Sequence, residues 1–89
     1  MPDRYPPLTP AEVVKVLLCR GFFLDRKKGS HHQYVGTWNG SKHTVTVDMS
    51  WPTYNDPDLI KSMILQSGMT REQFYGATTK TAKKINLKK

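Results

Sequence analysis

The sequence SHHQYVGTWNGSKHTVTVDM, residues 30–49, encodes two strands and the turn that joins them. Asn39-Gly40 is typical of a type I′ hairpin turn, because both central residues of that turn take positive φ angles. The turn predicts one strand over residues 30–37 and another over residues 41–49. In the later strand, valine and methionine at positions 45, 47 and 49 alternate with polar residues, which predicts one apolar and one polar face.

Another strand is expected just before this hairpin. Residues 22–26 form a short aromatic and apolar run, which is typical of a strand. Residues 27–29 end in glycine and are expected to turn the chain into the next strand. The three strands together predict a small antiparallel sheet, because short turns join each strand to the next.

A helix is expected before the first strand in the sequence. Thr9 can cap it, Pro10 suits its first position, and Glu12 completes a capping box. Gly21 follows its last turn in the position that usually ends a helix. Its predicted apolar face comprises Val13, Val14, Leu17 and Leu18.

Two further helices are expected after the sheet. Asp56 and Pro57 begin the longer one, and Gly68 ends it. Thr70 and Gln73 form a capping box that begins a short helix able to dock Phe74. The apolar face predicted for the longer helix comprises Leu59, Ile60, Met63 and Ile64.

These elements predict an α+β fold in the order helix, strand, strand, strand, helix, with a short C-terminal helix. The two long helices are expected to cover one face of the sheet and to leave the other open, which is the plan of double-stranded-RNA-binding domains. We expect residues 1–8 to be an extended lead-in, residues 9–77 to be one domain, and residues 78–89 to be a basic, frayed tail.

The charge balance indicates an anionic partner. Fourteen Lys and Arg oppose seven Asp and Glu, which gives a net charge of +7, so nucleic acid is the simplest partner, with an acidic protein as an alternative. The single cysteine, Cys19, excludes an internal disulfide, indicates a reducing compartment and is expected to be at least half-buried. The sequence shows no signal pattern and no membrane-span run, so we expect a soluble, cytoplasmic protein.

Two histidines follow the Gly29-Ser30 turn and form the candidate site. Strand alternation places His31 with Gln33 and His32 with Tyr34, and Tyr34 is the better core candidate. His31 is therefore expected to face out, with His32 as the second choice. A histidine near neutral pH suits general acid or base chemistry as well as a simple contact with nucleic acid.

Several motifs together resemble the HicA toxins, also called YcfA-like proteins. They are Gly21-Phe22 after the first helix, the run from Lys28 to His32, the strand Thr44–Val47, and the segment Leu59–Phe74. The resemblance covers about residues 10–75 and implies the fold described above. It implies a small ribonuclease that cleaves messenger RNA and is blocked by a HicB antitoxin, so that the chain is a monomer when free and part of a hetero-oligomer with the antitoxin.

The resemblance assigns the catalytic histidine to His31, and no metal or cofactor is implied. Many members of the family carry a proline and then a second histidine just after the third strand, where this chain has Asp48-Met49-Ser50-Trp51-Pro52 and no histidine. This departure leaves two alternatives open, a non-catalytic RNA-binding module and a protein-interaction module. The residues expected to contact RNA are Arg26, Lys27, Lys28, Gly29, Ser30, Gln33 and Trp51. The remaining histidine, His43, is expected at the rim of the sheet.

Overall fold

The computed structural model describes residues 4–86. Its centre is a three-stranded antiparallel sheet in the order β1-β2-β3, formed by Phe23–Lys28, His31–Trp38 and Ser41–Asp48. Asn39 and Gly40 join β2 to β3 with φ angles of 51° and 79°, and Trp38 pairs with Ser41 beside them. The predicted hairpin and its left-handed turn residues are confirmed.

The turn between β1 and β2 differs from the prediction. Lys27 and Lys28 belong to β1, where they pair with His32 and His31, and only Gly29-Ser30 turn the chain. Gly29 takes a φ of 58°, which a two-residue hairpin turn requires. The strand thus extends two residues beyond the expected end, because pairing with β2 keeps both lysines extended.

Helix α1, Pro10–Cys19, begins with the predicted capping box: Thr9 accepts a hydrogen bond from the Glu12 amide at 3.1 Å, and its own amide donates to the Glu12 carboxylate at 2.9 Å. Its predicted apolar face is partly wrong. Val13 and Leu17 are buried, but Val16 takes the place of Leu18, which is 52% exposed. Positions i, i+3 and i+4 define one helix stripe, and Leu18 lies on its flank.

Helix α2, Pro57–Ser67, is capped by Asp56 and ends at Gly68, which has a φ of 78°. Ile60, Met63 and Ile64 are buried as predicted, whereas Leu59 lies at the exposed edge of that face. Helix α3, Arg71–Tyr75, begins with the predicted Thr70–Gln73 capping box and buries Phe74 completely.

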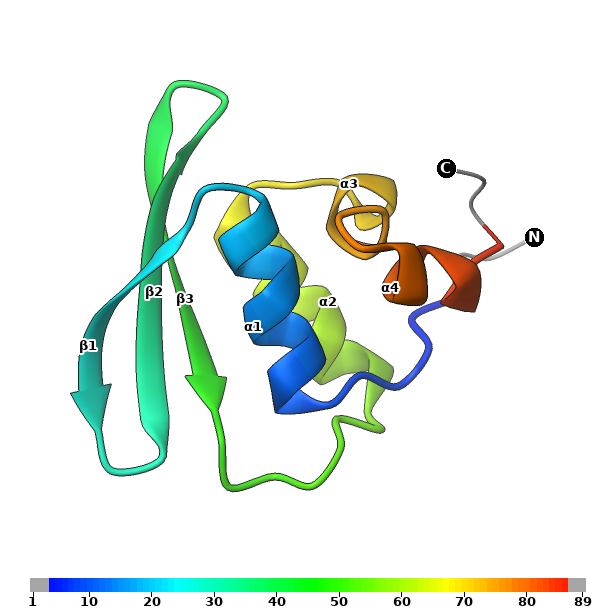
Figure 1. Ribbon diagram of the computed structural model, residues 1–89, viewed down its shortest axis with the longest axis horizontal. Helices are drawn as coiled ribbons and strands as arrows, with labels where there is room; N and C mark the ends of the chain where they lie inside the picture. The colour runs from blue at the N-terminus through cyan, green and yellow to red at the C-terminus, as the bar shows by residue number, and fades with distance from the viewer. Residues whose placement is uncertain (1–3, 87–89) are drawn as a thin grey trace.

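Helices α1 and α2 pack on the same side of the sheet, and both contact β3 (Figure 1). Tyr34, Val45 and Val47 point from the sheet into the core between these layers. Within residues 4–86, no helix covers the opposite face of the sheet (Figure 1). The predicted α+β architecture is therefore present, with one covered face and one open face.

Two terminal segments are packed more tightly than expected. In the lead-in, Leu8 is fully buried and forms a two-hydrogen-bond bridge with Tyr54. Part of the supposedly frayed tail forms helix α4, Thr79–Lys84, which buries Thr81 and Ala82. The expectation of a solvated end is wrong for these residues because α4 docks on the helical layer. Residues 87–89 lie outside the described part of the chain.

No helix within residues 4–86 is long and apolar enough to cross a membrane.

Cys19, expected to be at least half-buried, is exposed at the end of α1.

Candidate functional site

The open face of the sheet gathers most of the predicted site residues. Pairing across the three strands aligns Lys28, His31 and Asp48 in one row, and Arg26, Gln33 and Thr46 in the next. Because paired residues in an antiparallel sheet project to the same face, these two rows form one surface. A hollow of about 300 Å³ lies over it, lined by Arg26, Lys28, His31, Gln33 and Thr46.

His31 occupies the position expected of a reactive side chain. Its imidazole is 62% exposed, and Nε2 lies 3.5 Å from Oδ2 of Asp48. The buried Tyr34 confirms the strand phase that places His31 outside. Nε2 is the ring nitrogen that faces the carboxylate, and Nδ1 is the second ring nitrogen able to form hydrogen bonds.

Asp48 is a site residue that the sequence reasoning missed. The Asn39-Gly40 turn fixes the register of the hairpin, and counting outward from that turn places Asp48 opposite His31. The signal was therefore present in the sequence. A carboxylate beside a histidine orients the ring and stabilises its protonated form.

The surroundings of Asp48 keep its carboxylate charged. The Ser50 hydroxyl and amide donate hydrogen bonds to Oδ1 at 2.7 and 3.0 Å. These bonds are the main reason that the pKa of Asp48 falls to about 2, and a Ser30 hydrogen bond and the charge of His31 lower it further. Asp48 is thus ionised across the neutral range.

The structure separates Lys27 and His32 from the hollow. They pair with each other, and His32 also pairs with Val47, whose side chain is buried under the helices. Strand alternation therefore directs both residues toward the helix-covered side. Gly29 and Ser30 form the turn next to the hollow, where Ser30 also faces Asp48.

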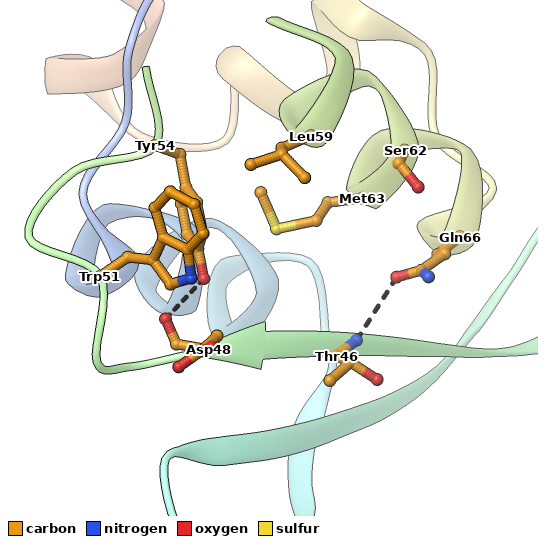
Figure 2. Close-up of a pocket in the computed structure, with 8 residues that line it drawn as sticks. All are labelled: Thr46, Asp48, Trp51, Tyr54, Leu59, Ser62, Met63 and Gln66. Atoms are coloured by element: carbon orange, nitrogen blue, oxygen red, sulfur yellow. Dashed lines mark hydrogen bonds between the residues drawn. The ribbon is translucent and has the colours of Figure 1, made fainter. Parts of the chain in front are cut away.

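Trp51 lies in a second pocket, of about 200 Å³, at the outer edge of β3 (Figure 2). Its ring contacts that of Tyr54, with 5.9 Å between centroids. Thr46 lines both this pocket and the hollow, and Asp48 lines the pocket while contacting His31. The two cavities are therefore neighbours across β3.

The third histidine, His43, takes no part in either cavity. It is half-buried on the helix-covered side, and its ring lies against Gly68. Within residues 4–86, no cluster of three or more His, Cys, Asp or Glu side chains has an arrangement that would hold a metal ion.

No family model, characterised protein or solved structure matches this chain. The functional assignment therefore depends on the geometry of the site.

Proposed function

We propose that this protein is a metal-independent RNA endonuclease in which His31 is the general acid/base. The observation that carries the proposal is the position of this imidazole, exposed on the open sheet face and 3.5 Å from the Asp48 carboxylate. Arg26 and Lys28 line the same hollow. A base, its orienting carboxylate and two phosphate-binding cations are thus available on one surface.

In the proposed reaction, His31 takes the proton of a ribose 2′-hydroxyl. The oxygen attacks the adjacent phosphorus, the bond to the 5′-oxygen breaks, and the protonated imidazole of His31 returns its proton to that oxygen. The products are a 2′,3′-cyclic phosphate and a free 5′-hydroxyl. Arg26 and Lys28 are cations suited to stabilising the extra negative charge on the phosphorane in the transition state.

The arrangement of the domain supports RNA as the substrate. Two helices on one sheet face and an open opposite face follow the plan of double-stranded-RNA-binding domains. The net charge of +7 favours contact with phosphates. Lys42, opposite Thr37 in the register, extends the positive charge along the open face. These features support RNA in general, and the resemblance to HicA toxins is what implies messenger RNA as the substrate.

The direct test of this function is cleavage of a defined RNA in the presence of a chelator. The expected products carry 2′,3′-cyclic phosphate and 5′-hydroxyl ends, because the 2′-oxygen is the nucleophile. The same RNA with 2′-O-methyl groups is the control and stays intact. Products with 5′-phosphate ends, or cleavage of the methylated RNA, would contradict the mechanism.

The proposed biological setting is a type II toxin–antitoxin system in the cytoplasm, with a HicB-like antitoxin as the partner. All six residues of β1 are exposed along one edge of the sheet, and Phe23 is 56% exposed. Arg26, Lys27 and Lys28 add positive charge to this edge. An unpaired apolar and basic edge suits an acidic segment that adds a strand.

This partner is testable with the small acidic protein encoded by a neighbouring reading frame, if one is present. Size-exclusion chromatography should show a monomer for the free chain and a hetero-oligomer for the mixture. Phe23→Asp should weaken the complex, since it places an acid on the docking edge. An unchanged complex would assign the interface to another surface.

One observation favours a second function, RNA binding without cleavage. The hollow contains a single histidine, and residues 48–52, the segment where many HicA members have another, contain none. A binding module predicts salt-dependent RNA association that survives His31→Ala and yields no cleaved products.

A further inference from the structure

We propose that the pocket at Trp51 binds one nucleobase of the RNA strand whose phosphate occupies the neighbouring hollow. This assignment rests on the proposed nuclease function and adds a determinant of base preference to it. It concerns an unpaired nucleotide, since only an unstacked base can enter a pocket of this kind.

The walls of the pocket suit a flat aromatic ring. Trp51 is 46% exposed, and its ring lies beside that of Tyr54 at an interplanar angle of 30°; both rings line the pocket. Leu59 and Met63 project from α2 toward these two rings (Figure 2). At about 200 Å³, the pocket is smaller than the roughly 300–1,000 Å³ of sites for drug-sized ligands. Its size therefore suits a single ring system.

The polar groups at the other end of the pocket can supply hydrogen-bond donors. Oε1 of Gln66 accepts from the Thr46 amide at 3.4 Å, which leaves its Nε2 group as a donor (Figure 2). The Ser62 hydroxyl also lines the pocket. These donors match a carbonyl oxygen or ring nitrogen of a base.

The charged residues of the two cavities determine which cavity receives the base and which receives the phosphate. The ionised Asp48 lines the Trp51 pocket and no Lys or Arg among residues 4–86 lines it to offset this charge, so a phosphate is repelled from this cavity. Arg26 and Lys28 line the hollow on the open face and attract it. Because Thr46 borders both cavities, a strand that crosses β3 can place its phosphate near His31 and an adjacent base against Trp51.

A peptide strand is a poorer occupant of the same edge. Strand addition needs free backbone groups along the outer side of β3. Gln66 already binds the Thr46 amide, and the Tyr54 hydroxyl donates to the Asp48 carbonyl at 2.7 Å. Two backbone positions of this edge are therefore occupied by side chains of the same chain.

Fluorescence provides a direct test because the chain has two tryptophans. A Trp38→Phe protein, which reports only Trp51, is titrated with a hexanucleotide carrying 2′-O-methyl riboses and with an abasic hexamer of equal charge. We expect quenching by the first oligomer only. Trp51→Ala, followed by the anisotropy of labelled oligomers, should lower affinity for the base-containing oligomer about 5- to 150-fold, and Trp51→Phe should retain most of it.

Equal quenching by both oligomers, or an unchanged affinity in Trp51→Ala, would overturn the nucleobase site. Binding of an acidic peptide at Trp51 in place of either oligomer would also overturn it. Since the methylated oligomer is not a substrate, its binding is measured independently of catalysis. Failure of the nuclease function appears separately, as intact unmodified RNA in the cleavage assay.

Discussion

The imidazole of His31 and the carboxylate of Asp48 face each other across the β2–β3 ladder, with 3.5 Å between Nε2 and Oδ2. The hairpin register creates this pair, and the Ser50 hydrogen bonds hold the carboxylate in its charged form. A catalytic role for His31 therefore makes Asp48 a positioning residue.

Asp48→Asn should slow RNA cleavage without abolishing it. The amide keeps the size of the side chain but cannot stabilise the imidazolium that forms when His31 takes a proton. We expect the loss to be smaller than the roughly 100-fold lower bound for removing a general acid/base. The measurement is the single-turnover cleavage rate across pH, in which a purely structural role would leave the pH profile unchanged.

Asp48 should also make the folded state sensitive to acid. Its pKa is about 2 in the folded protein against 3.8 for an ordinary aspartate. The unfolded chain therefore binds the proton first, and the stabilisation is present above about pH 4 and is lost between about pH 4 and pH 2. Urea unfolding across this window should show a shallower loss for Asp48→Asn than for the wild type.

Asp25→Asn is the control for that experiment, because it removes one negative charge from the exposed strand β1. It should retain the acid-induced loss of stability. Parallel curves for the wild type and Asp48→Asn would contradict the role assigned to the Ser50 hydrogen bonds.

Lys28→Ala and Lys27→Ala should differ in their effect on RNA binding, although the two residues are neighbours. Lys28 lines the hollow, whereas Lys27 pairs with His32 on the other side of the strand. Lys28→Ala should weaken binding and reduce the slope of log affinity against log salt by about 0.7, the value for one contact with a single strand. Equal slopes for both variants would show that RNA affinity depends on the net charge of the protein and not on the position of the lysine.

The sequence was most informative where local chemistry controls the structure. The Asn39-Gly40 turn and the caps at Thr9, Asp56 and Thr70 depend on neighbouring residues, and all of them are present. Strand alternation likewise identified His31 as exposed and Tyr34 as buried. These features arise from backbone preferences that do not require the rest of the fold.

The features that were missed depend on contacts between distant parts of the chain. Leu8 is buried where it forms a backbone bridge with Tyr54. Helix α4 is linked to the N-terminal segment by a hydrogen bond that Lys84 donates to the Pro7 carbonyl, at 3.1 Å. Glu12 also lies within 4 Å of two lysines of α4, Lys80 and Lys84. No local pattern in a lysine-rich segment predicts an acidic partner so far away in the sequence.

Gly68→Ala should destabilise the protein more than Gly21→Ala. Both glycines have positive φ angles, 78° and 87°, so each substitution costs about 1–2 kcal/mol of backbone strain. At Gly68 the new Cβ would also lie 2.6 Å from the His43 ring, whereas at Gly21 it meets nothing within 4 Å. That clash adds a cost on the order of 1–3 kcal/mol.

The free energy of unfolding in urea measures this difference. Replacing His43 with Ala in the Gly68→Ala background should recover part of the additional loss, because the clash is removed and the strain remains. Equal destabilisation by the two glycine substitutions would show that the His43 ring moves aside without cost.

The role of His31 as the general acid/base is decided by the RNA cleavage rates of His31→Ala and His32→Ala, measured on folded proteins with matched circular dichroism spectra. We expect His31→Ala to lower the rate by about 100- to 10,000-fold, the range for a general acid/base. His32→Ala, on the helix-covered side, should retain a rate near that of the wild type. Cleavage by His31→Ala at the wild-type rate would show that His31 is not the general acid/base.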